Sequence, residues 1–228
     1  MDGLKTLLTE FDVAAAFWMT VKLTLLSAVG SLLIGTLVAV MRVSPVEVLR
    51  AFGTAYVTVV RNTPLTLIVF FCAFGLYNNL GLRLAPESAT SLAENNFRFS
   101  IVALSVYHAS FVAEAIRSGI NTVPKGQAEA ARAIGLGFVP TLTNVVLPQA
   151  FRGAIAPLGN VLIALTKNTT VVATVGVAEL SYTMKGMLET NSSLLYTIFF
   201  LIAICFVILT LPVGVLFTSL SRRLVVHR

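Results

Sequence analysis

Charged residues are scarce in this chain. Asp, Glu, Lys and Arg make up only 11% of its 228 residues, whereas a soluble globular domain carries roughly 25%. Apolar residues make up 57%, and several runs of about 20 residues hold almost no charge, which is long enough to cross the ~30 Å hydrocarbon core of a bilayer. The composition therefore excludes an ordinary secreted or cytosolic enzyme and indicates a membrane protein.

Cysteine is equally scarce, with only Cys72 and Cys205 in the whole chain. Both lie within apolar runs, where a cysteine behaves as a small hydrophobic residue. We therefore expect neither a disulfide framework nor a metal site. The chain also lacks a Gly-x-x-x-x-Gly-Lys-Ser/Thr loop, whose backbone and lysine hold nucleotide phosphates. We expect no cofactor in this chain, no catalytic residues and no ATP hydrolysis by the chain itself.

Five stretches are apolar enough to cross a membrane as helices. The net charge is +6, but the basic residues gather beside these stretches instead of forming a patch with exposed aromatics, which argues against a nucleic acid partner. We thus expect a multi-pass, all-α protein of the cell membrane, surrounded by lipid and built as one domain. The predicted spans cover residues 13–41, 52–79, 98–119, 152–176 and 192–220.

The distribution of Lys and Arg predicts the orientation of these spans. Five spans place the two termini on opposite sides, and one set of alternate connections holds nine cations while the other holds only Lys5, Arg83, Arg98 and Lys185. Because cytoplasmic loops carry the excess of Lys and Arg, we expect the N-terminus outside and the C-terminus in the cytoplasm. The nine cations are Arg42, Arg50, Arg117, Lys125, Arg132, Arg152, Arg222, Arg223 and Arg228.

Small residues recur at every fourth position of the first span, at Ser27, Ser31 and Gly35. Positions four apart share one face of a helix, and small side chains there let another helix approach closely. This pattern predicts a helix–helix contact along that face.

The longest connection expected in the cytoplasm, residues 120–151, is too apolar to be a simple tether. Its run from Gln127 to Ile134 suits a short helix, and Gly135 tolerates the left-handed conformation that ends many helices. A short exposed helix with an alanine face can enter a groove on a partner protein. The alternative is a surface helix that packs only on its own protein.

The segment Glu129-Ala130-Ala131, followed by Gly135 and later by Val145-Val-Leu-Pro148, resembles the EAA signature of permease subunits of bacterial ABC importers. Val145 stands where Ile is usual. The resemblance implies the type I importer permease fold, with the 120–151 segment acting as a coupling loop toward a separate ATP-binding subunit. The residues it assigns to that loop are Gly126, Glu129, Ala130, Ala131, Gly135, Leu147 and Pro148.

Two further boxes narrow the resemblance. Residues 61–65, Arg-Asn-Thr-Pro-Leu, resemble the Arg-Gly-Thr-Pro-Leu box of polar amino acid permeases, with Asn62 replacing the common Gly, and residues 167–170, Lys-Asn-Thr-Thr, resemble their Lys-Asn-Thr-Ser box. Together with residues 41–45, these boxes look most like the glutamate permeases of actinobacteria. The resemblance implies glutamate as the substrate, with glutamine, aspartate or a basic amino acid as alternatives.

The same resemblance implies a set of partners. These are a second permease subunit, either a paralogue or another copy, two ATP-binding subunits that hold ATP and Mg, and an extracellular solute-binding protein. The sequence leaves two other classes open. One is a membrane anchor or regulatory subunit that does not transport, and the other is a channel or secondary transporter that acts alone.

Arg61 and Lys167 lie well inside predicted spans, where an unpaired charge is costly. Both are followed by Asn-Thr, so we predict two helix breaks at membrane depth, the first with Thr63 as the cap of a helix that starts at Pro64. A helix N-terminus there would favour a carboxylate. The residues assigned to a substrate path are Arg61, Asn62, Thr63, Pro64, Lys167, Asn168 and Thr169.

The alternative for these polar residues is structural: Arg61 extends to the inner interface, and Lys167 and Asn168 satisfy carbonyls freed by the break.

Glu114 and Arg117, three residues apart, are predicted to form an ion pair on one helix. That pair either anchors the coupling loop or acts as a gate. His108 lies between Ser105 and Ser110, but all three share one helix and no Gly-x-Ser-x-Gly elbow exists, so hydrolase chemistry is not expected.

Overall fold

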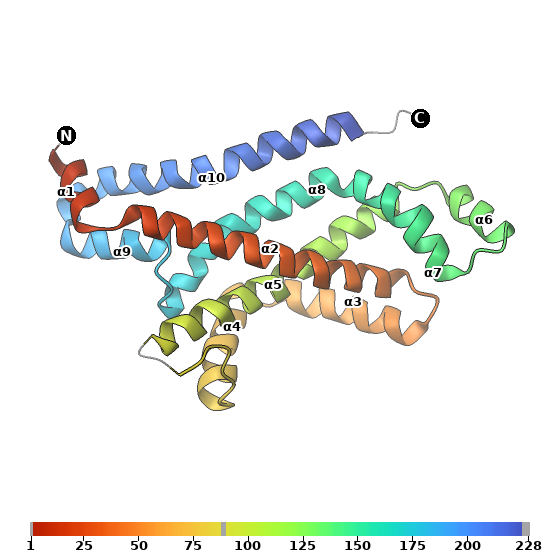
Figure 1. Cartoon of the computed structure of the whole chain (residues 1–228), viewed down its shortest axis with the longest axis horizontal. Helices are drawn as coiled ribbons and strands as arrows, with labels where there is room; N and C mark the ends of the chain where they lie inside the picture. The colour runs from red at the N-terminus through yellow and green to blue at the C-terminus, as the bar shows by residue number, and fades with distance from the viewer. Residues whose placement is uncertain (1, 88–89, 225–228) are drawn as a thin grey trace.

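The computed structural model describes residues 2–87 and 90–224, and every regular element in those ranges is a helix. Four long helices run along the long axis of the molecule (Figure 1). They are α2 (Val13–Val43), α5 (Ser91–Ile120), α8 (Leu147–Asn168) and α10 (Leu195–Leu224). The shorter α-helices are α1 (Asp2–Glu10), α3 (Glu47–Asn62), α4 (Leu65–Phe70), α6 (Lys125–Ala133), α7 (Phe138–Thr141) and α9 (Leu180–Thr190). Two π-helices, η1 (Phe71–Asn79) and η2 (Leu142–Val146), and two 3-10 helices, η3 (Thr169–Val175) and η4 (Ser192–Leu194), complete the described chain.

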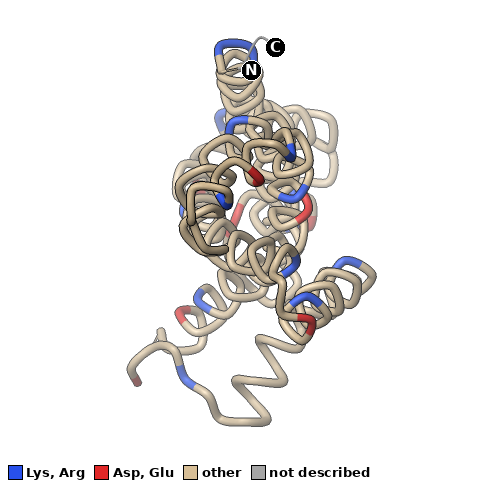
Figure 2. Tube along the Cα trace, turned by 90° about the vertical axis from the view of Figure 1, so that its right-hand side faces the viewer, with Lys and Arg blue, Asp and Glu red and all other residues tan. Residues whose placement is uncertain are grey.

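Within the described residues, four helical stretches are long and apolar enough to cross a membrane. Long parts of the trace carry no charged residue at all (Figure 2). The bent pair Glu47–Asn62 and Leu65–Asn79 provides a fifth crossing if it is counted as one span. The all-α, multi-span prediction is therefore confirmed, while the orientation of the termini stays a prediction. The four stretches are Val13–Val43, Ser91–Ile120, Phe138–Val175 and Ser192–Leu224.

The centre of the bundle is α5, which packs against both α2 and α8. Ser27, Ser31 and Gly35 on α2 are all buried, and a Cβ atom added at Gly35 would lie 2.6 Å from Val112 Cβ on α5. The Ser105 hydroxyl of α5 donates to the Ser27 carbonyl at 3.4 Å. The predicted close approach along the small-residue face of α2 is thus confirmed, and only residues without bulk permit it.

Helices α10 and α4 lie on opposite sides of this central layer (Figures 1 and 2). α10 packs on α8, where a Cβ atom at Gly159 would meet the Phe217 side chain at 2.5 Å. Only 11% of the apolar window in the stretch that contains α10 is buried. Most of the surface of α10 is therefore left to lipid or to another protein.

The predicted break in the second span is present as a bend of 104° between α3 and the α4–η1 helix. Thr63 and Pro64 are extended at the bend, with ψ angles of 130° and 132°. Proline has no N–H to continue the helix and forces the preceding residue out of the helical region. The prediction that Thr63 caps the next helix is wrong, because its hydroxyl donates backwards to the Val59 carbonyl at 2.9 Å.

The prediction of a second, similar break at Lys167–Asn168 is also wrong. Residues Phe138–Val175 form one candidate span without a sharp bend, and α8 passes at Thr169 into the 3-10 turns of η3. The segment contains no proline after Pro157, so backbone N–H groups remain to continue the helix. The end comes later, at Gly176, which has a positive φ of 79°.

Candidate functional site

The segment predicted to couple to a partner is helical and lies at one end of the molecule, beyond the long helices (Figure 1). Its helix α6 begins after Pro124 and ends at Ala133. Gly135 has φ 92°, its N–H donates to the Arg132 carbonyl, and the Leu136 N–H donates to the Ala131 carbonyl. These two bonds form a Schellman motif, which satisfies the last carbonyls of the helix. The remainder of the 120–151 segment, α7 and η2, leads directly into α8.

One face of α6 packs inward and another is free. Ala131 is 5% exposed, whereas Ile134, directly after the helix, is 81% exposed. Glu129 and Ala130 are exposed as well, and a Cβ atom at Gly126 would meet no atom within 4 Å. The structure therefore presents a carboxylate and small apolar groups on a surface that this chain leaves uncovered. Of the other assigned residues, Pro148 is exposed and Leu147 is half-buried at the start of α8.

Glu114 on α5 lies among three arginines from three helices. Its Oε1 is 2.6 Å from Nη1 of Arg42 on α2 and 3.9 Å from Nη1 of Arg61 on α3. Its Oε2 accepts from Nε and Nη2 of Arg117 at 3.1 and 2.9 Å. The structure thus brings Glu114 and Arg117 together as the spacing suggested, and it adds two partners that no local spacing indicates. One carboxylate ties α2 and α3 to α5.

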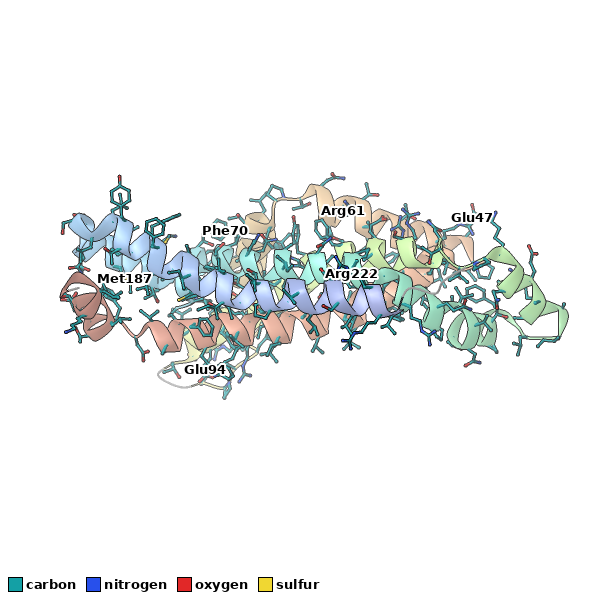
Figure 3. The ribbon with its side chains drawn as sticks, turned by 90° about the horizontal axis from the view of Figure 1, so that it is seen from above. Glu47, Arg61, Phe70, Glu94, Met187 and Arg222 are labelled. Carbon is teal, nitrogen blue, oxygen red and sulfur yellow. The ribbon has the colours of Figure 1, made fainter. Side chains whose placement is uncertain are left out.

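Arg61 lies about midway along the molecule, while Glu47 at the other end of α3 lies toward α6 (Figure 3). Its guanidinium carbon is 5.1 Å from the centroid of the Phe111 ring, a cation–π contact. The side chain remains 44% exposed, so part of the guanidinium is free to meet a ligand or a partner. Asn62 and Pro64 are exposed beside it.

The helices that follow the two boxes, α4 and η3, pack against each other. Leu65 and Val69 of α4 share a buried cluster with Val172 and Val175 of η3. The chain directly after the bend therefore rests on the chain directly after Lys167–Asn168. Within the second box Lys167 is exposed, and Thr169 is buried with its hydroxyl donating to the Thr166 carbonyl at 2.8 Å.

Asn168 is held by His108. The Asn168 side-chain Nδ2 is 3.1 Å from Nε2 of His108, and Nδ1 of the same ring is 3.0 Å from the Leu104 carbonyl. Because a carbonyl can only accept, Nδ1 carries the proton and Nε2 accepts from the Asn168 amide. The imidazole is 1% exposed, so this bond is a buried tie between α5 and α8. Because the Asn168 nitrogen faces the imidazole of His108, the Asn168 side-chain oxygen points away from that imidazole.

Comparison with known proteins decides the family. Residues 31–226 match the model of the binding-protein-dependent transport system inner membrane component. The chain belongs to this family. Its members named among the relatives are permeases, so the predicted resemblance to importer permeases and the location in the inner membrane are confirmed.

Individual relatives are similar in sequence to this chain over most of its length. The glutamate transport system permease protein GluC of Corynebacterium glutamicum is 55% identical over 214 residues, which cover 93% of this chain and 94% of the relative. The probable glutamine ABC transporter permease protein GlnM of Bacillus subtilis is 36% identical, with 91% of both chains covered. The glutamate/aspartate import permease protein GltK of Escherichia coli is 31% identical, covering 90% of this chain and 89% of the relative.

Solved structures agree on the fold. An amino acid ABC transporter crystallised with histidines matches with a TM-score of 0.77 and 28% identity, covering 92% of this chain and 93% of that one. An inward-facing form of the MetNI methionine ABC transporter matches with a TM-score of 0.72, covering 94% of this chain and 96% of that one. At 21% identity the second match shows the fold alone. The type I permease fold expected from the EAA resemblance is confirmed.

Sequence reasoning missed three residues that the family fold positions. Arg42 was counted only as an orientation signal, and His108 was considered only for hydrolysis. The third is Glu179, which is 0% exposed and caps α9 by accepting from the N–H groups of Ser181 and Tyr182, both at 2.9 Å. Burial raises its pKa to about 7, against the opposing effect of those two bonds and of nearby Lys185. Its position directly before an amphipathic run was the available signal, but Glu is not among the preferred N-cap residues.

Proposed function

We propose that this chain is the permease subunit of an ATP-driven ABC importer and that its substrate is glutamate. The observation that carries the proposal is the similarity to glutamate transport permeases over nearly the whole length of both chains. Relatives more distant in sequence include permeases for glutamine, arginine and cystine as well as a glutamate/aspartate permease, which supports a polar amino acid as the substrate class.

ATP hydrolysis is assigned to a separate subunit that docks on α6. Exposed Glu129 pairs with basic groups in a docking groove, Ala130 allows close approach, and the left-handed turn at Gly135 sets the exit direction of the chain. A complete importer contains a second permease subunit, two ATP-binding subunits that hold ATP and Mg, and an extracellular solute-binding protein. Closure of the ATP-binding subunits moves α6 and shifts the permease pair between inward-facing and outward-facing states.

The substrate path is assigned to the region around the two boxes, where the helices that follow them, α4 and η3, pack together. Arg61 offers a half-exposed guanidinium about midway along the molecule, and Asn168 offers an oriented amide. A guanidinium with free N–H groups binds a carboxylate in a bidentate geometry. Either carboxylate of glutamate therefore has a chemically matched partner in Arg61, as does the α-carboxylate of any amino acid.

Uptake of labelled glutamate tests the proposal. Cells that lack the native gene and express the wild-type chain with its partner subunits are expected to accumulate glutamate, and unlabelled glutamate is expected to compete better than glutamine or arginine. Arg61→Ala and Lys167→Ala are expected to weaken the apparent affinity while the complex still assembles. Normal affinity in both variants would remove these residues from the path, and transport of another amino acid in preference to glutamate would overturn the substrate assignment.

A further inference from the structure

A cavity of about 630 Å³ lies beside α6, on the side away from the free face of that helix. It is bounded by the turn between α2 and α3, by the end of α5 and by the chain from α6 to η2. Val43, the last residue of α2, and Ile120, the last residue of α5, both line it. The cavity therefore lies where two membrane-spanning helices end. At ~1.5 Å per residue, helices of about 30 residues are long enough to reach the head-group region of a bilayer.

The charged residues of this cavity are all cations. Arg50 enters from α3, and Lys125 and Arg132 enter from α6, whereas none of the lining residues is acidic. In the part of the chain that the structure describes, none of the three forms an ion pair. Arg50 donates one hydrogen bond from Nη1 to the Ser44 carbonyl at 3.2 Å, which fixes its guanidinium at the cavity wall. Three cations without a carboxylate create a positive potential that an anion would neutralise.

The remaining wall is largely apolar. Val43 and Pro45 contribute from the α2–α3 turn, and Phe138, Leu142 and Val146 contribute from α7 and η2. A small inorganic anion gains nothing from such walls, because its oxygens need hydrogen bonds on every side. A molecule with a negative head and an apolar body matches both parts of the lining.

We propose that this cavity binds an anionic phospholipid of the adjacent leaflet. The phosphate lies among Arg50, Lys125 and Arg132, and the upper acyl chains lie on the apolar wall formed by α7 and η2. Clusters of Lys and Arg next to a membrane span are attracted to anionic lipids. The bound lipid connects α3, which carries Arg61, to α6, and so it would steady the docking helix against the bundle.

Native mass spectrometry of the full chain in mild detergent tests the proposal, with added phosphatidylglycerol or phosphatidylcholine as the probe. Wild type is expected to retain one phosphatidylglycerol far better than phosphatidylcholine. The triple variant Arg50→Gln, Lys125→Gln, Arg132→Gln is expected to lose about tenfold or more in phosphatidylglycerol affinity. Ala128→Trp, which fills the cavity from α6 and leaves the three cations in place, is expected to lose the same lipid.

The matched control is the triple variant Arg152→Gln, Arg222→Gln, Arg223→Gln. These cations also belong to the basic set beside the spans, are all exposed, and do not line the cavity. This control is expected to bind phosphatidylglycerol as wild type does. Equal losses in both triple variants, equal binding of the two lipids, or displacement of the lipid by inorganic phosphate would each overturn the proposal, the last by assigning the site to a soluble anion.

Discussion

Arg42 on α2 and Glu114 on α5 form an ion pair with Nη1 and Oε1 2.6 Å apart. The two side chains are 13% and 24% exposed, and Glu114 also binds Arg117 and lies near Arg61, at the end of α3 before the bend. A single carboxylate on α5, the helix that leads to α6, thus lies within 4 Å of three guanidinium groups. We propose that this group anchors the coupling segment to the bundle.

Glu114→Gln is expected to destabilise the chain by about 2 kcal/mol, because it removes the carboxylate while leaving partly buried arginines without a charged partner. The free energy of unfolding of the purified chain in detergent measures this effect. Glu94→Gln is the matched control on the same helix. Glu94 is 43% exposed and faces Arg98 at 3.9 Å, so its loss should stay below about 1 kcal/mol. Equal losses in the two variants would refute a special role for Glu114.

Pro64→Ala is expected to reduce glutamate uptake severalfold without loss of expression. Alanine restores an N–H and removes the steric restriction that keeps Thr63 extended. Helix α3 is then able to continue through the position of the bend. Pro212→Ala in α10 is the control, since Pro212 lies inside a helix that does not break and is exposed there. Uptake by the Pro212 variant should equal that of wild type. Undiminished uptake by Pro64→Ala would show that transport does not require the proline at the bend.

The hydrogen bond between His108 and Asn168 is expected to stabilise the folded chain. The coupling free energy between the two residues should be about 1 kcal/mol. A double-mutant cycle with His108→Leu, Asn168→Leu and the combined variant measures it, because the second substitution should cost less once the first partner has gone. The pair Thr20 and Asn191, which lie in different contacts, provides a cycle expected to be additive. Additivity for His108 and Asn168 would show that the bond contributes nothing.

Glu179 is expected to make stability depend on pH. Its pKa is raised from 4.5 to about 7 in the folded chain, chiefly because burial disfavours the charged form. Between these two pKa values the folded chain binds more protons than the unfolded chain, so stability falls as the pH rises through this window. Raising the pH from 5 to 8 should cost wild type up to about 3 kcal/mol relative to Glu179→Gln.

Unfolding measurements on both chains at the two pH values test this, because the other titrating groups cancel in the difference. Gln in place of Glu179 keeps an acceptor oxygen for the cap but does not titrate. A difference between the two chains that stays constant from pH 5 to 8 would mean that Glu179 ionises at its ordinary pKa despite its burial.

Local features of the chain were predictable from the sequence, and long-range ones were not. The turn at Gly135 follows from a helix-forming run that ends at glycine, and the bend follows from Pro64, because both depend on neighbouring residues alone. The same Asn-Thr pattern misled at Lys167, where the missing proline decides whether the backbone breaks. An Asn-Thr pair after a cation therefore predicts a helix break less well than a proline does, because proline lacks the N–H that would continue the helix.

The partners of the polar side chains show the limit more clearly. Arg117 lies one helical turn from Glu114, so its contact was predictable from spacing. Arg42 lies 72 positions away along the chain, and only the packing of α2 on α5 brings it to Glu114. Likewise His108 meets Asn168 across the α5–α8 interface. Such pairs require the tertiary structure, since hydropathy alone does not fix how two spans are rotated against each other.

Co-purification with the partner subunits tests the central claim most directly. Tagged chain is isolated in mild detergent from cells that express the whole transport system, and the proteins that accompany it in stoichiometric amounts are identified by mass. Wild type is expected to bring down an ATP-binding subunit and a second permease subunit. Glu129→Arg on α6 is expected to lose the ATP-binding subunit but keep the second permease. Glu189→Arg, an exposed residue of α9 at the opposite end of the molecule, is expected to keep both. If wild type brings down no ATP-binding subunit, even after crosslinking in membranes, the account of this chain as the permease of an ATP-driven importer is wrong.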